Sequence, residues 1–226
     1  DVYKRQVFEN AFALALALIV DNVRWGKNFF RSAFYVPVLV SGIVSGFIWK
    51  IMYNYNFGTI NTILKDIGMG DFRQDWLGNN KLTLIMIGVV LVWKGAGYYM
   101  IIYLASLQSV SPDLIEAAQI DGATWWKTLW KVKLPMVMPS ITICVFLTLT
   151  NSFKLFDQNL ALTGGDPNHF TEMLALNIYQ TFYARAGAQW KGLGQAKAVL
   201  FCVLVIAISM IQLLSLIHIS EPTRLD

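Results

Sequence analysis

Long apolar segments recur along this chain of 226 residues, and short polar connections separate them. An α-helix needs about 20 apolar residues to cross the hydrocarbon core of a bilayer. Because backbone groups in lipid must be satisfied internally, such segments fold as helices or closed barrels. The pattern predicts an all-α, polytopic transmembrane helical bundle with about five visible spans, the first of them truncated. The apolar segments cover residues 7–20, 33–53, 82–107, 136–156 and 196–216.

The composition agrees with a membrane protein, since 56% of the residues are hydrophobic and only 14% are charged. Soluble domains carry about 25% charged residues. The net charge of +4 does not indicate a nucleic-acid partner, because the basic residues form no single stripe. Lysines and arginines beside spans instead set topology, and they are denser on the cytoplasmic side. We predict that 54–81 and 158–195 lie outside and that the other two connections, 21–34 and 108–134, are cytoplasmic, with Arg24, Lys27, Arg31, Lys127, Lys131 and Lys133.

Both ends of the chain depart from the apolar pattern. Residues 1–6 (DVYKRQ) and about 215–226 (SLIHISEPTRLD) are predicted to be non-native, and LIHISEPTR in particular resembles translated adapter sequence; the alternative is a short native amphipathic tail. The segment 7–20 reaches about 21 Å as a helix, whereas the hydrocarbon core is about 30 Å thick. It is therefore predicted to be the second half of a spanning helix, within a membrane domain covering 7–217.

The stretch 111–135 (SPDLIEAAQIDGATWWKTLWKVKLP) is polar between two spans and still has helix signals. Ser111 suits an N-cap and Pro112 suits the first helical position. Asp121-Gly122 is a turn signal, and Thr124 suits the cap of a second short helix, which Leu134-Pro135 would end. Tryptophans and lysines alternate in that second helix, as expected at headgroup depth. The stretch predicts a helix–turn–helix at a membrane surface; the alternative is a linker between spans.

The spacing of Glu116-Ala117-Ala118, Gly122, Val132 and Leu134-Pro135 resembles the cytoplasmic loop of binding-protein-dependent ABC importer permeases. Val132 replaces the commoner isoleucine. The flanking residues resemble the sugar-type branch, which includes maltose, multiple-sugar and glycerol-phosphate permeases. The similarity extends over about 7–214 and implies the type I importer permease fold in a multi-pass protein of the bacterial inner membrane.

The resemblance also implies partners for the segment 108–135. It would dock an ATPase subunit, with Glu116 meeting an arginine or lysine of that subunit and Gly122 allowing the turn. The complete assembly would contain a second permease subunit, two ATPase subunits, an extracytoplasmic solute-binding protein and the bilayer. The implied docking residues are Glu116, Ala117, Ala118, Asp121, Gly122, Val132, Leu134 and Pro135.

The sequence contains no signature of catalysis. It has no G-x-x-x-x-G-K-[ST] phosphate-binding loop, no G-x-S-x-G and no H-E-x-x-H. His218 lies in the tail predicted to be non-native, and His169, alone in a loop, is predicted to be a solvated residue rather than a ligand or base. We therefore predict a transport subunit that is not an enzyme and holds no cofactor, with ATP and Mg²⁺ bound by the partner ATPase subunits.

Ionisable residues inside spans are candidates for a solute path, and Lys94, Lys154 and Asp157 meet that description. Sugar sites also combine aromatic faces with neutral polar groups, which adds Trp93, Tyr98, Asn151, Phe153 and Phe156 as candidates. In the alternative interpretation, Lys154 and Asp157 pair at the outer interface, and the aromatic side chains only pack.

Three other functions remain open on the sequence. The solute could be a glycerol phosphate ester or another small molecule in place of a sugar. The chain could be an ATP-independent channel or secondary transporter, although no coupling-ion site or inverted repeat is evident. It could also be a membrane scaffold whose loop only recruits a soluble partner.

Overall fold

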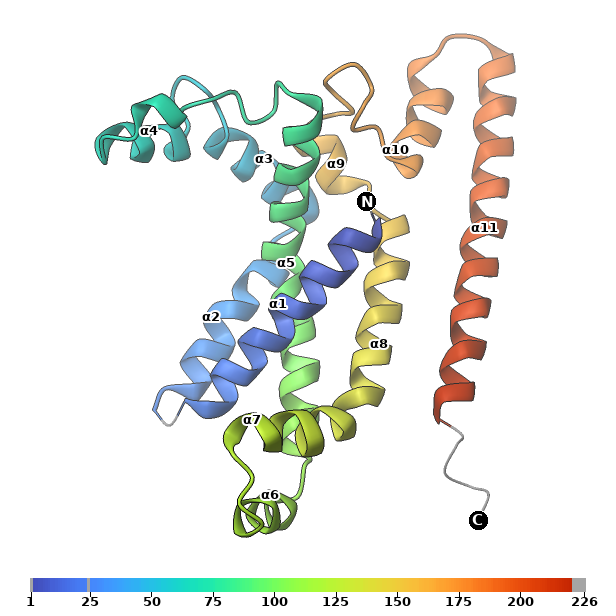
Figure 1. The fold of residues 1–226 in the computed structure, drawn as a ribbon. Coiled ribbons are helices and arrows are strands. Elements are labelled where there is room, and N and C mark those ends of the chain that lie inside the picture. The colour runs from blue at the N-terminus through green and yellow to red at the C-terminus, as the bar shows by residue number, and fades with distance from the viewer. Residues whose placement is uncertain (1, 24, 221–226) are drawn as a thin grey trace. The chain divides into compact units, whose positions relative to one another are not determined.

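The computed structural model describes residues 2–23 and 25–220, with side chains described for 5–23 and 25–214. These residues form helices and connections, and no strand occurs among them (Figure 1). The all-α prediction is confirmed. The helices are α1 (Val2–Asn22), α2 (Lys27–Leu39), α3 (Gly42–Met52), α4 (Thr59–Asp66), η1 (Gly70–Phe72), α5 (Asn80–Gln108), α6 (Pro112–Ile120), α7 (Trp125–Thr128), η2 (Leu129–Lys133), α8 (Leu134–Phe153), α9 (Asp157–Leu162), α10 (Leu174–Tyr179), η3 (Gln180–Ala184) and α11 (Ala188–Ser220).

Three stretches of helix in the described residues are long and apolar enough to cross a membrane: Asn80–Gln108, Trp125–Phe153 and Ala188–Leu214. They contain most of the predicted spans 82–107, 136–156 and 196–216. Helix α5 runs without a break through Lys94, Gly95 and Gly97.

The helix predicted to run without interruption over 33–53 is wrong in its continuity, because the helix breaks at Val40-Ser41. Helices α2 and α3 have the composition of a span only when taken together. Pro37 inside α2 lacks the N–H of a regular helical bond, and Ser41 has extended dihedral angles (φ −53°, ψ 146°). Helix α2 nevertheless continues past Pro37 to Leu39, and the chain leaves helical geometry only at Val40-Ser41.

Both ends of the chain, 1–6 and about 215–226, were predicted to be non-native. Helix α1 begins at Val2, so the described part of 1–6 is helical, and the Gln6 amide donates to the carbonyl of Val145 (2.8 Å). The predicted foreign origin of this segment stays a prediction. Of the predicted non-native segment 215–226, residues 221–226 lie outside the described residues, as do the side chains of 215–220, among them His218.

The chain divides into two compact units. The first comprises the described residues up to Leu39, Gly95–Leu149 and those from Ser209 onward; the second comprises Val40–Lys94 and Thr150–Ile208. In the first unit, α1, α5 and α8 enclose an apolar core. Its buried members include Ala13, Ala17, Val20, Tyr99, Met100, Tyr103, Leu104, Leu107, Val137 and Cys144.

A buried polar network ties the three helices of that core together. The hydroxyl of Tyr103 in α5 donates to the side-chain oxygen of Asn10 in α1 (2.7 Å). The amide of Asn10 donates to the hydroxyl of Thr148 in α8 (3.0 Å). Interhelical hydrogen bonds of this kind replace the hydrophobic driving force that is absent between helices in lipid.

The core of the second unit lies around Tyr53, Ile87, Val90, Leu91 and Leu162. The connection after α3 contains the short helix α4. Asn61, which is buried, organises this connection: its side chain donates to the Gln74 carbonyl (3.0 Å) and accepts from the Trp76 indole (3.0 Å).

Candidate functional site

The segment between α5 and α8 begins with the short helix α6, and its start follows the sequence signals. The Ser111 hydroxyl accepts a hydrogen bond from the backbone N–H of Asp113 (3.3 Å), as an N-cap does. Pro112 occupies the first helical position, where a missing N–H costs nothing. Asp113 places a negative charge beside the positive end of the helix dipole. The predicted first helix of the loop therefore forms as expected.

Helix α6 ends in a Schellman motif at Gly122. This residue has φ +75°, a left-handed conformation that costs side-chain-bearing residues about 1–2 kcal/mol. The N–H of Ala123 donates to the carbonyl of Ala118 (2.9 Å), and the N–H of Gly122 donates to that of Gln119 (3.0 Å). The turn predicted at Asp121-Gly122 is thus present, and its backbone angle favours glycine.

The second helix of the loop starts as predicted but does not end as predicted. The Thr124 hydroxyl accepts from the N–H of Lys127 (3.5 Å) and caps α7. The helix then continues through η2 into α8, whereas an end at Leu134-Pro135 was expected. At this point the Leu134 N–H donates to the carbonyl of Leu129, five residues back. This wider turn is of the π type, and it carries the helix across Pro135, which has no N–H to donate.

One side of the loop is buried and the other is exposed. Ile115 packs against the core of the first unit, and Thr128 and Leu129 are buried. Glu116 and Ala117 are exposed, and Ile120 keeps 86% of its surface. No ion pair of Glu116 occurs within the described part of the chain, so its carboxylate is available to a cation from outside. The exposed side of α6 therefore combines small, acidic and apolar residues.

The predicted solute-path residues divide by environment. Trp93 packs edge-on against Trp49 (ring centroids 5.4 Å apart), and Phe156 packs edge-on against Tyr179 (5.2 Å). Tyr98 stacks edge-on with Tyr99 at 5.4 Å. Asn151 and Lys154 are exposed at the end of α8 and just beyond it, and Phe153 is half-buried. Only Lys94 and Asp157 come to one place, at the start of α3.

The proposed pairing of Lys154 with Asp157 is wrong. Helix α8 ends at Phe153 and α9 begins at Asp157, so the two residues do not lie one turn apart on a single helix. No ion pair joins them within the described residues. Asp157 lies instead against Gly42, the first residue of α3.

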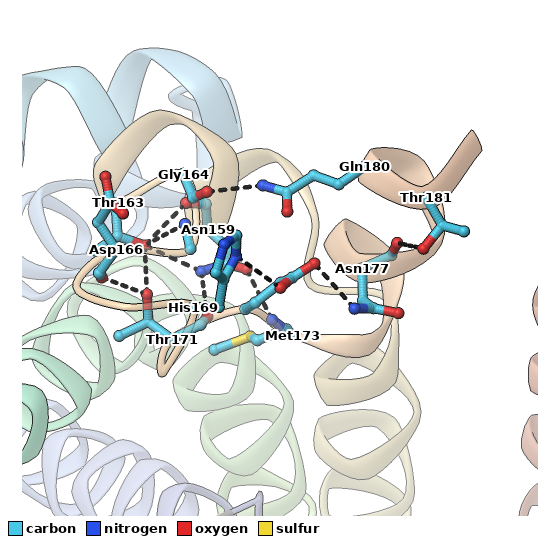
Figure 2. A network of polar contacts seen from close by, with 12 residues as sticks. Asn159, Thr163, Gly164, Asp166, His169, Thr171, Met173, Asn177, Gln180 and Thr181 are labelled. Atoms are coloured by element: carbon cyan, nitrogen blue, oxygen red, sulfur yellow. Dashed lines mark hydrogen bonds and ion pairs between the residues drawn. The ribbon is translucent and has the colours of Figure 1, made fainter. Parts of the chain in front are cut away.

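The connection from α9 to α10 is held by a dense polar network (Figure 2). The buried Asn159 amide donates to the Thr171 carbonyl (2.8 Å), and the Asn159 oxygen accepts from the Met173 N–H (3.1 Å). The exposed His169 pairs with Glu172 (3.1 Å). The chain continues from this connection as α10 followed by η3. A hollow of about 410 Å³ lies there, lined by His169, Glu172, Gln180, Thr181, Ala184 and Arg185.

The sequence profile of one protein family, the binding-protein-dependent transport system inner membrane component, matches residues 10–223. The chain belongs to this family. A similar relative of this inner membrane component is a probable starch degradation products transport system permease protein of Thermoanaerobacterium thermosulfurigenes. The two are 41% identical over 206 residues, which are 91% of this chain and 68% of the relative.

Two solved structures share the fold of this inner membrane component. One is a bacterial ABC transporter involved in the import of the acidic polysaccharide alginate, with a TM-score of 0.82 and 22% identity over 96% of this chain and 78% of the other. The second is a bacterial alginate ABC transporter in complex with a periplasmic protein that holds an alginate pentasaccharide, with a TM-score of 0.76 and 21% identity over 96% and 76%. The expected importer-permease fold is therefore confirmed.

Sequence reasoning missed the role of Asp21 in this inner membrane component. Its carboxylate accepts from both Lys27 and Lys133 (3.3 Å each) and so joins the connection after α1 to the end of the loop. Arg31 likewise donates to the side chain of Gln108 (2.9 Å). These contacts place the connections 21–34 and 108–134, both predicted to be cytoplasmic, side by side. Arg24, the remaining basic residue of 21–34, lies outside the described residues. Asp21 is the only acid in 21–34, a signal that could have been noticed.

Proposed function

We propose that this chain is the membrane-spanning permease subunit of an ATP-driven importer for sugars. The observation that carries the proposal is the exposed surface of α6, where Glu116 has no ion-pair partner within the described residues and Gly122 turns the chain in a left-handed conformation. A solvent-facing helix that is capped at both ends is a rigid element, and a rigid element suits the transfer of force between subunits.

The energy for uphill transport comes from a partner, because this sequence holds no phosphate-binding loop. An ATPase subunit binds α6 and places an arginine or lysine beside Glu116. Ala117 and Ala118 keep that contact close, while Asp121 and Gly122 shape the turn. Val132, Leu134 and Pro135 carry movement of the loop into α8, because no end of helix separates them from it.

The relatives support the sugar class and the remaining partners. The starch-product permease protein and the alginate transporters are named for carbohydrates. One alginate transporter is seen with its periplasmic protein, which supports a solute-binding protein as a partner here. We therefore assign the chain to the bacterial inner membrane, in complex with a second permease subunit, two ATPase subunits and a solute-binding protein.

Reconstitution in vesicles tests the proposed function. The permease subunit, its second permease, the ATPase and a maltodextrin-loaded binding protein should together take up labelled maltodextrin only when ATP is present. The control replaces the ATPase with a variant unable to hydrolyse ATP, and vanadate should abolish uptake. Uptake of maltodextrin that continues with the inactive ATPase would support a channel, and uptake of glycerol 3-phosphate alone would remove the sugar assignment.

Labelling of single cysteines tests the orientation. Cysteines at Lys27 and Lys127 should react only from the cytoplasmic side, and those at Asp71 and Asn168 only from outside. Helix α8 joins the connections that contain Lys127 and Asn168, so the two positions should behave oppositely. The exposed native thiol of Cys202 is first changed to serine, whereas Cys144 is fully buried. Labelling of the Lys127 position from outside would contradict both the orientation and the docking role.

A further inference from the structure

The chain leaves helical geometry just before α3, and a lysine from α5 meets it there. The ammonium group of Lys94 donates to the backbone carbonyl of Val40 (2.6 Å), across 54 positions of sequence. A carbonyl released from helical bonding needs a partner wherever water is scarce. Cations are also favoured beside exposed carbonyl groups, because these carry partial negative charge. Lys94 therefore satisfies a backbone group that the break leaves without its helical partner.

A carboxylate lies on the other side of the same break. A Cβ atom placed on Gly42 would be 2.7 Å from the Cβ of Asp157 and 3.2 Å from its Oδ2. Gly42 is the first residue of α3, where unpaired N–H groups create partial positive charge. Ser41 makes no side-chain capping bond there. The carboxylate of Asp157 thus lies at the end of α3 that favours negative charge.

Asp157 is held in this position by the packing of α9 on α3. A Cβ atom on Gly46 would be 2.7 Å from that of Ala161, so the helices are in close contact one turn further along α3. Ser45, which lies between Gly42 and Gly46 in α3, is fully buried. The break is flanked by two opposite charges, each beside the backbone groups that it stabilises.

We propose that Lys94 and Asp157 are positioning residues that fasten the start of α3 at the helix break. The sequence made both residues candidates for contact with the solute, whereas the role proposed here is structural. It goes beyond the proposed function and does not depend on the solute or on the ATPase. The two charges fix the residue at which α3 begins. Helix α9 of the second unit packs against α3.

Hydrogen exchange at the start of α3 tests this assignment in the purified subunit in lipid nanodiscs. The reporter is the peptide covering 40–47, which includes the Ser45 N–H bonded to the Ser41 carbonyl (2.9 Å). Lys94→Met should raise the exchange rate of this peptide about tenfold or more, because a charge-assisted bond is lost. Asp157→Asn should raise it in the same direction by a smaller factor. Lys94→Arg, which keeps a charged donor, should stay closer to the parental rate than Lys94→Met.

A matched control separates this effect from general loosening. Lys50→Met removes an exposed lysine from α3 itself and should leave the exchange rate of the peptide 40–47 unchanged. In all variants, the exchange rate of the peptide 59–66, which covers α4, should also stay unchanged. If Lys94→Met fails to fold, Asp157→Asn still decides the question. Parental exchange at 40–47 in a folded Lys94→Met or Asp157→Asn variant would overturn the proposal. Because the measurement needs no ATP and no solute, its failure would leave the importer assignment untouched.

Discussion

Replacing Gly97 by alanine should sharply lower the yield of folded protein. A Cβ atom at this position would overlap the carbonyl oxygen of Phe34 in α2 and would lie 2.9 Å from the Phe34 carbonyl carbon and 3.1 Å from the Tyr35 Cα. All three atoms belong to backbone, so no side-chain rotation can relieve the contact. Added methyl groups in packed interiors typically cost about 1–3 kcal/mol, occasionally more, and a rigid neighbour should bring the cost to the upper end.

The matched control for Gly97→Ala is Gly88→Ala in the same helix. A Cβ at Gly88 would meet no atom within 4 Å, and alanine favours helix by up to about 1 kcal/mol relative to glycine. Gly88→Ala should therefore match or exceed the parental thermal midpoint in detergent. Gly97→Ala should lower that midpoint and the monodisperse fraction in size-exclusion chromatography. Parental values for Gly97→Ala would mean that α2 and α5 do not approach each other here.

The features that could be predicted from the sequence are those with local causes. The span in α5 follows from its length and apolarity alone. The caps of α6 and α7 follow from Ser111 and Thr124, whose hydroxyl groups reach backbone N–H groups within three residues. The turn at Gly122 follows from the backbone freedom of glycine, and its φ of +75° needs that freedom. Such rules need no knowledge of the rest of the fold.

The features that could not be predicted depend on distant partners. The break before α3 is accompanied by a contact with Lys94, 54 positions away from Val40, and nothing around 33–53 indicates that partner. The role of Asp21 depends equally on Lys133, 112 positions away. Lys154 and Asp157 have the spacing of a helical pair, but the end of α8 lies between them. Spacing along a sequence predicts contact only while the helix continues.

The exposed loop offers the second prediction, which concerns Glu116 and Gly122. Glu116→Ala should abolish most ATP-driven uptake while the subunit still inserts and folds, since the residue is exposed and lies outside the candidate spans. Removing one partner of a buried charge pair costs about 2–5 kcal/mol, much of it from the charge left alone. The control is Gln119→Ala, which changes another exposed side chain of α6 and should transport at the parental rate. Uptake and co-purification of the ATPase are measured together.

Gly122 should act through the backbone and not through a clash. A Cβ there would meet no atom within 4 Å, so the φ of +75° is the only obstacle to a side chain. Gly122→Val should therefore disrupt the Schellman motif and move α7 relative to α6, with loss of uptake. Gly122→Asn should retain much more activity, because asparagine tolerates left-handed angles better than other side chains. Equal loss in both variants would point to steric exclusion at the ATPase surface and not to the turn.

A charge exchange decides whether the surface of α6 is a docking site. Glu116→Arg should lose uptake, and an acidic residue in place of the opposing cation of the ATPase should recover part of it. Recovery requires that the two side chains meet, because a distant effect on folding would not depend on the sign of a charge in another subunit. Uptake at the parental rate in Glu116→Ala and in Gly122→Val would reduce the loop to a linker. The energy would then have to enter through another surface of the chain, and the connection after α1, which Asp21 ties to Lys133, would be the first place to look.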